Sequence, residues 1–186
     1  MLQNKLALRR LLITIHLYAA GFLAPIFIVV GLTGALYIMG AEPETTARQV
    51  TLPADAKLDL SSPSLEDDVR SLLSETDVDV RFGYLRVWDG GFQTRPTSRA
   101  FVEVDVTEEG MTATYHRPGL YFALLELHKG HGPELFRLYQ ILSGIGMLIV
   151  VLGGIAVGLL APAYQKVTLG ASAVGLVGFI LLGFLV

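Results

Sequence analysis

The sequence predicts an integral membrane α-helical protein with three transmembrane helices and a small extracytoplasmic α+β domain. Of its 186 residues, 52% are hydrophobic, and these fall into blocks with nearly all of the charged residues between them. Three blocks, 11–39, 138–165 and 167–186, contain no Asp, Glu, Lys or Arg. Each provides the ~20 residues that a helix needs to cross a bilayer core. A soluble domain has no use for three such segments.

The first block is interpreted as a retained membrane anchor. Its apolar stretch is about twice the ~7–15 residues found in a cleaved signal peptide. Lys5, Arg9 and Arg10 precede it, and an excess of positive charge in a short segment marks the cytoplasmic side. We therefore expect residues 1–40 to form a cytoplasmic N-terminus and the first transmembrane helix.

The polar middle of the chain is then expected on the outer face. Residues 41–63 are rich in Pro, Ser and Thr and are typical of a linker. Residues 64–117 predict an α+β domain. Its helix begins after Ser64 as N-cap and ends near Ser74.

Three strands are expected after this helix, because the composition alternates and is rich in β-branched and aromatic residues. The segments are 78–89, 99–106 and 111–117. Thr107–Gly110 is interpreted as a hairpin turn that joins the last two strands.

The remainder is predicted to return to the membrane. Residues 118–132 form a helix too short to span, lying at the outer interface and ended by Gly130. Pro133 and Glu134 start the second transmembrane helix, 133–161. Residues 162–186 form a short cytoplasmic loop and the third transmembrane helix.

Composition excludes several functions. A net charge of −3 gives no basic surface for nucleic acid. The absence of cysteine excludes disulfides, thiolate catalysis, iron–sulfur ligation and covalent c-type haem attachment. No hydrolase or nucleotide-binding motif is present. Any metal or haem must therefore be held by His, Met, Tyr or carboxylate side chains.

Several segments resemble the PepSY-associated transmembrane family. They are IHLYAAGFLAPIFIVVGLTGALY in the first block, the hairpin FVEVDVTEEGMTATYHR, and LHKGHGPELFRLYQILSGIGMLIVVLGGI entering the second block. The resemblance covers residues 11–160. It implies a PepSY-like domain at 64–117 in the periplasm of a bacterium, with the helices in the inner membrane. Larger members resemble reductases that bind b-type haem through membrane histidines and deliver electrons outward, for example to ferric siderophores.

His16 is the only ionisable side chain of the first block apart from tyrosines, and such groups within a span are costly and usually functional. It matches the LH motif of the family, which implies an axial haem ligand. Gly21, Gly31 and Gly34 leave room for a flat ring. The alternative is an imidazole that reaches the lipid headgroups or hydrogen-bonds another helix.

His128 and His131 form a second candidate site, with Glu126 and Glu134 flanking them. Two histidines and a carboxylate are ligands that suit zinc or non-haem iron. The histidines are also candidate haem ligands. The alternative is a solvated polar collar around the helix entry. His116, on a strand, is expected at the surface or at a hinge.

One haem cannot take both His16 and His131 of the same chain. Across a ~30 Å hydrocarbon core they lie on the order of 25 Å apart, whereas two axial nitrogens on one iron are ~4 Å apart. A haem on His16 therefore needs its second ligand from another subunit, a partner protein or Met147. The repeats of small residues at Gly154 and Gly158 are interpreted as helix packing or as space for a porphyrin.

Three functions follow. The first is haem- or metal-linked electron transfer toward the periplasm, with haem b bound by His16, His128 and His131. The protein would lie in the lipid bilayer, as a homo-oligomer or in a complex with a partner membrane or periplasmic protein. The alternative is a non-enzymatic, membrane-tethered module that binds or regulates another envelope protein. Metal handling by Glu126, His128, His131 and Glu134 is a third possibility.

Overall fold

The computed structural model describes residues 2–54, 56–108 and 110–185. These residues separate into two units. One unit runs from Phe27 to Gln140, and the other holds the described residues up to Ile26 and from Ile141 onward. Helices α1 (Leu2–Ile38) and α4 (Glu134–Leu160) each contribute to both units.

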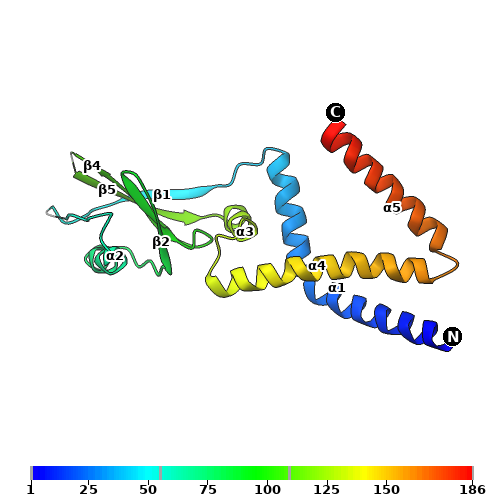
Figure 1. Cartoon of the computed structure of the whole chain (residues 1–186). Coiled ribbons are helices and arrows are strands. Elements are labelled where there is room, and N and C mark those ends of the chain that lie inside the picture. The colour runs from blue at the N-terminus through cyan, green and yellow to red at the C-terminus, as the bar shows by residue number, and fades with distance from the viewer. Residues whose placement is uncertain (1, 55, 109, 186) are drawn as a thin grey trace. The chain divides into compact units, whose positions relative to one another are not determined.

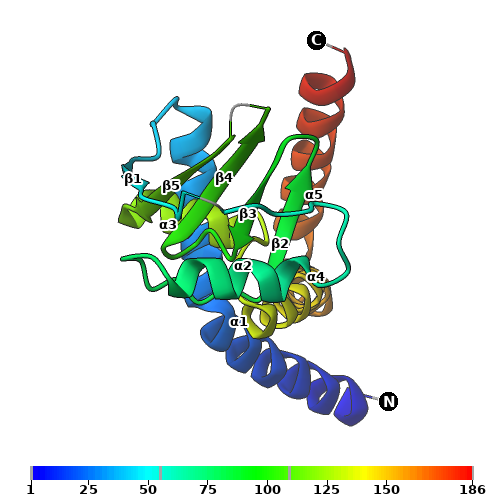
Figure 2. The ribbon, with the colours of Figure 1, turned by 90° about the vertical axis from the view of Figure 1, so that its left-hand side faces the viewer.

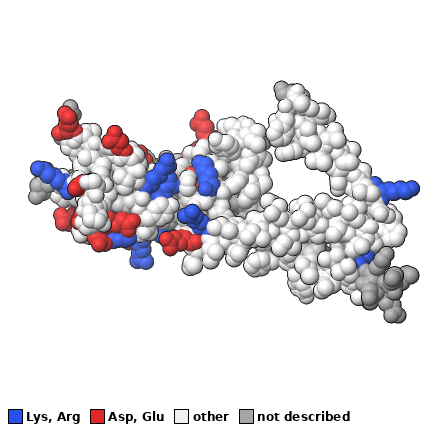
Figure 3. All heavy atoms as spheres, viewed as in Figure 1, with Lys and Arg blue, Asp and Glu red and all other residues white. Residues whose placement is uncertain are grey.

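The predicted fold class is confirmed. Within the described residues, three helical stretches are long and apolar enough to cross a membrane: Leu6–Ile38, Glu134–Leu160 and Gln165–Leu185. The last combines α5 (Gln165–Ile180) with the π-helix η1 (Leu181–Leu185). Figure 3 shows few charged side chains along these helices on the visible face and many over the strands. The predicted third span ended at Val186, which lies outside the described residues.

The first helix starts earlier than the uncharged block. Helix α1 already includes Arg9 and Arg10, because arginine is a good helix former and does not end a helix. Pro25 lies inside α1, one residue before the boundary between the two units.

The described strands form one antiparallel sheet in the order β1-β5-β4-β3-β2, as Figure 2 shows. Figure 1 labels these strands and helices along the chain, coloured from the N-terminus to the C-terminus. Their bounds are β1 Thr45–Val50, α2 Leu65–Ser74, β2 Tyr84–Trp88, β3 Gly91–Arg95, β4 Phe101–Thr107, β5 Gly110–Pro118 and α3 Leu120–His128.

Helix α2 covers one face of the sheet (Figure 2). Its buried residues are Leu65, Val69 and Leu73, spaced four apart and therefore on one face of the helix. They pack against side chains that alternate along the strands and point to the same face of the sheet, namely Phe92, Val102, Val104 and Ala113. Helix α3 packs on the opposite face of the sheet, where its Phe122 stacks on Phe101 of β4.

Two strands were not expected. Strand β1 lies within 41–63, which we expected to be a linker, and it pairs along its whole length with β5. Its sequence TTARQV is polar because it is a sheet edge with mostly exposed side chains. Its strand character depends on the partner rather than on local composition.

Strand β3 begins at Gly91, the second glycine of a Gly-Gly pair that directly follows the expected strand segment 78–89. Gly90 has φ +85° and closes the turn between β2 and β3. A Cβ on Gly91 would lie 2.5 Å from the carbonyl oxygen of Val104, so β3 and β4 approach too closely for any side chain there. The glycines make a hairpin instead of ending the sheet.

Strand β2 begins six residues later than the expected segment 78–89, at Tyr84. The other predicted helices and strands of this domain lie close to their expected positions. Helix α2 begins after Ser64 as expected, although the Ser64 hydroxyl donates to Asp68 (3.0 Å) rather than capping the backbone. Thr107 pairs with Gly110, and Glu109 of this predicted turn lies outside the described residues. Gly130 follows α3 with φ +82°, and α4 begins at Glu134.

Candidate functional site

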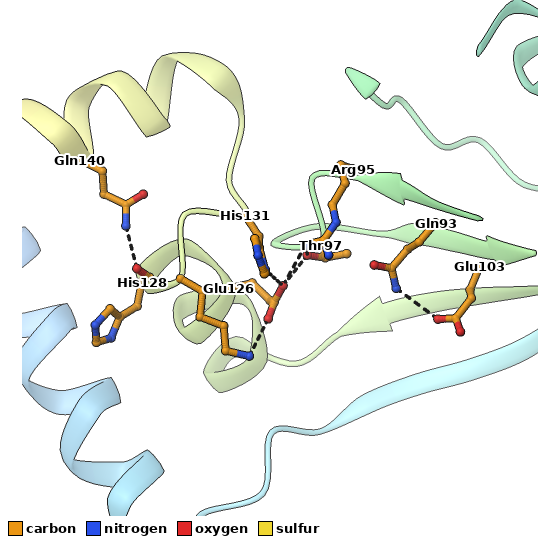
Figure 4. A network of polar contacts seen from close by, with 9 residues as sticks. Gln93, Arg95, Thr97, Glu103, Glu126, His128, His131 and Gln140 are labelled. Carbon is orange, nitrogen blue, oxygen red and sulfur yellow. Dashed lines mark hydrogen bonds and ion pairs between the residues drawn. The ribbon is translucent and has the colours of Figure 1, made fainter. Parts of the chain in front are cut away.

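Glu126 of α3 is the centre of a buried polar network in the Phe27–Gln140 unit. Only 6% of the residue is exposed. Its Oε2 accepts hydrogen bonds from Thr97 and from Nδ1 of His131 (2.7 Å), and it lies 3.5 Å from Nη1 of Arg95. Its Oε1 accepts from Nζ of Lys129 (3.0 Å). Figure 4 shows these side chains converging on the carboxylate, and we call them the Glu126 network.

The fold brings these residues together from three places in the chain. Arg95 is the last residue of β3, and Thr97 follows two residues later. Helix α3 carries Glu126 and is held to the sheet by Phe122, which stacks on Phe101 of β4 with ring centroids 6.1 Å apart. Buried charges are found paired and hydrogen-bonded, and this network satisfies that requirement.

Electrostatics keep the Glu126 carboxylate ionised. Burial raises its pKa, but the hydrogen bonds from Thr97, His131 and Lys129 together outweigh burial and hold the pKa below its ordinary value. Burial also lowers the pKa of Arg95, and the charge of Glu126 opposes that effect. Arginine stays protonated in proteins, so the two form a buried ion pair.

His128 points away from this network, although it lies only two residues after Glu126. Its Nδ1 lies 2.8 Å from the hydroxyl of Thr33 in α1. That hydroxyl donates its hydrogen to the carbonyl oxygen of Val29 (2.7 Å), so Nδ1–H of His128 is the donor to Thr33. A Cβ on Gly34 would lie 3.6 Å from Cε1 of this ring. We call these contacts the His128 site.

Gln140 of α4 adds a further contact there, because its side-chain amide donates to the carbonyl oxygen of His128 (2.9 Å; Figure 4). Within the Phe27–Gln140 unit, the end of α3 is therefore tied to both α1 and α4.

His16 is held in a similar way in the other unit. Its Nδ1 lies 3.0 Å from the carbonyl oxygen of Val150 in α4. Because a carbonyl can only accept, Nδ1 carries the hydrogen. A Cβ on Gly154 would lie 3.2 Å from Cε1 of the imidazole, so the missing side chain makes room for the ring. We call these contacts the His16 site.

The three candidate ligands thus share one feature. In each imidazole Nδ1 is the nitrogen that faces an oxygen, of Val150, Thr33 or Glu126, so Nε2 is the nitrogen left for a ligand bond. No described residue hydrogen-bonds to Nε2 of any of the three. Metal-ligating histidines usually donate their other ring nitrogen to a carbonyl or carboxylate in this manner. All three can therefore ligate through Nε2.

The four residues predicted as one metal site are not gathered. Glu126 and His131 meet, but His128 bonds Thr33 instead, and Glu134 lines a pocket beside Arg95. Among the residues described, no group of three or more His, Cys, Asp or Glu is placed to hold a metal ion. The oxygens of Glu126 are already taken by its neighbours, so this donor set does not fit zinc or non-haem iron.

His116, which we expected at the surface or at a hinge, is half-buried. Its ring stacks on Phe101 with centroids 4.7 Å apart, and its Nδ1 is sealed without a hydrogen-bond partner in the described part of the chain. It takes no part in the three histidine contacts above.

Sequence reasoning missed Arg95, Thr97 and Gln140, which have no local signature and are brought to the site by β3 and α4. It named Gly34 and Gly154 as packing positions or as space for a porphyrin. The structure places each against an imidazole ring. The signal that could have linked His16 to Gly154 is a histidine in one apolar helix and a pair of adjacent glycines in another.

A family model described as the PepSY-associated TM region matches residues 13–160. Neither the comparison with curated proteins nor that with solved structures gave a match. The matched range begins just before His16 and ends at the last residue of α4.

Proposed function

This chain belongs to the PepSY-associated TM region family, and from that premise we propose that it takes part in haem-linked electron transfer toward the periplasm. It acts from the bacterial inner membrane, as an oligomer or as the subunit of a larger complex. The N-terminus is cytoplasmic and the strand domain is periplasmic.

The His16 site is the single observation that carries this proposal. An ionisable side chain within a membrane span costs free energy, and the side chains found there are usually functional. The carbonyl of Val150 orients this ring and fixes its tautomer, and Gly154 leaves it space. A histidine needed only for helix packing would not have to leave Nε2 without a partner in the described structure.

Haem b held by Nε2 of His16 would supply one-electron chemistry within the membrane. A second ligand would come from His16 of a second copy, from a partner protein, or from Met147. Met147 precedes Val150 by one helical turn on α4, so both positions lie on the same side of that helix. His128 and His131 are the candidate ligands for a group on the outer side.

The strand domain then serves as the place where a partner or electron acceptor docks. It carries most of the charged side chains seen in Figure 3, and the Glu126 network holds α3, with His128 and His131 at its end, in a fixed relation to the sheet.

The test is the absorption spectrum of the detergent-purified full chain, expressed with haem supply. The proposal expects a Soret band that is lost or strongly diminished in His16→Ala. It also expects the band to be retained in His116→Ala, because that ring bonds none of the candidate ligands. Absence of a Soret band in the wild type would contradict the proposal.

A non-enzymatic interaction module is the second candidate, and one observation favours it. Strand β2 is an edge of the sheet, with Val87 and Trp88 exposed by 44% and 37%. Such an edge can accept a strand from another chain. This function requires no cofactor, so His16→Ala and His128→Ala should behave as the wild type. Deletion of the strand domain should abolish binding of the partner protein.

A further inference from the structure

A second site lies on the other side of Arg95. A pocket of about 260 Å³ opens between the ends of β2 and β3 and the start of α4, and all of its lining residues belong to the Phe27–Gln140 unit. The side chains used here are Tyr84, Arg95, Arg99, Glu134 and Leu135. This volume is several times the ~30 Å³ share of one water, so it can accept a phosphate-sized group.

Arg95 brings an incompletely used guanidinium to this pocket. The residue is 4% exposed, and its Nη1 is occupied by Thr97 (2.8 Å) and Glu126. Its Nε and Nη2 donate to no described residue. A buried arginine that lines a pocket and keeps two donors, Nε and Nη2, without a described partner matches the two oxygens of an oxyanion.

The surrounding charge has the matching sign. Arg99 lines the pocket. Burial lowers the pKa of Arg95, and the nearby positive charge of Arg86 lowers it further, whereas Glu126 and Tyr84 raise it. Three other cationic side chains lie near Arg95, namely Arg86, Arg99 and Lys129, together with two carboxylates, Glu126 and Glu134. The positive end of the 27-residue helix α4 faces the same region.

The lining also has an apolar side. Leu135, in the first turn of the membrane-spanning helix α4, is 83% exposed and lies beside the arginines. The start of such a helix lies at the level of the lipid headgroups. The pocket therefore presents guanidinium groups where phosphates are abundant and an apolar side chain toward the lipid tails.

We propose that the pocket between β3 and the start of α4 binds a phosphate oxyanion through Arg95 and Arg99, either as an anionic lipid headgroup or as free phosphate. This inference does not depend on haem binding. Arg95 makes the bidentate contact, and Arg99 adds a second charge from the rim.

The experiment is calorimetric titration of the full chain in neutral detergent with three probes: dihexanoyl-phosphatidylglycerol, dihexanoyl-phosphatidylcholine and inorganic phosphate. Arg99→Gln is the main variant, because Arg99 is exposed and stands outside the Glu126 network. Arg95→Lys keeps the charge and removes the fork. Arg81→Gln is the matched control, an exposed arginine that does not line this pocket.

We expect saturable binding of phosphatidylglycerol or phosphate, weakened about tenfold or more in Arg99→Gln and in Arg95→Lys, and unchanged in Arg81→Gln. Phosphatidylglycerol alone identifies a lipid site, and equal binding of inorganic phosphate identifies a free phosphate site. No saturable binding of either probe would overturn the proposal, and so would wild-type affinity in Arg99→Gln.

Discussion

The His16 site and the His128 site hold an imidazole by the same means in different units of the molecule. In each, Nδ1–H is donated to an oxygen of a neighbouring helix and Cε1 lies against a glycine of that helix. The oxygens differ. Val150 offers a backbone carbonyl, which only accepts, whereas Thr33 offers a hydroxyl whose own hydrogen is given to Val29.

The two sites therefore differ in what keeps them intact. The His16 site needs only the backbone of α4 and the space at Gly154. The His128 site needs Thr33 and the position of α3, and α3 is fixed to the sheet by the Glu126 network. A change in the strand domain should therefore disturb His128 and spare His16.

The largest expected effect separates the two sites most clearly. Glu126→Gln leaves the buried Arg95 without its counter-charge, and removing one partner of a buried ion pair costs about 3–5 kcal/mol. Urea unfolding followed by Trp88, the single tryptophan, reports on the strand domain. Asp77→Asn, which breaks the exposed pair with Arg48, should cost no more than ~1 kcal/mol. Equal losses in the two variants would remove Glu126 as the support of α3.

Acid should weaken the same network. The folded pKa of Glu126 lies below its ordinary 4.5, so the unfolded chain binds the proton more tightly than the folded one. The stabilisation is complete above 4.5 and is lost as the pH falls through the lowered folded pKa. The gap in thermal midpoint between wild type and Glu126→Gln should therefore narrow with acidification below pH 4.5. A constant gap would contradict the ionised carboxylate.

The His16 site is tested by adding one methyl group. In Gly154→Ala the new Cβ would lie 3.2 Å from the ring, so the imidazole must shift, at a cost of about 1–3 kcal/mol for overpacking. Gly153→Ala has open space within 4 Å and is the matched control. We expect haem content to fall in the first variant only. Equal haem content in both variants would show that Gly154 does not determine the position of His16.

The same change at the His128 site should be tolerated, since a Cβ on Gly34 would stand at an ordinary 3.6 Å from the ring. Thr33→Val instead removes the hydroxyl that receives Nδ1–H, at a cost of about 1 kcal/mol for the lost hydrogen bond. Thermal unfolding of Thr33→Val beside Gly34→Ala checks this order. A larger loss in Gly34→Ala would show that space, not the hydroxyl, positions His128.

The sequence was sufficient for the features that depend on composition along a single segment. The three apolar helices, α2 with its apolar residues four apart, the strand pair closed by Thr107 and Gly110, and Gly130 at the end of α3 all followed from local patterns. Strand β1 did not, because TTARQV becomes a strand only through pairing with β5.

The site depended even more on contacts between distant segments. His16, His128, His131 and Glu126 could be singled out because histidine and buried acid are uncommon near a span. Their partners could not, since Arg95 and Val150 belong to elements whose positions are set by the fold. The sequence grouped His128 with His131, whereas the turn at Lys129 and Gly130 after α3 was enough to point them at different partners.

The central claim is that His16 presents Nε2 to a haem iron inside the membrane. The most direct measurement is the reduced-minus-oxidised difference spectrum of the purified full chain, recorded for the wild type, His16→Ala and His116→Ala. We expect a low-spin haem signal in the wild type and in His116→Ala that disappears in His16→Ala. A signal of the same size and shape in all three proteins would contradict it.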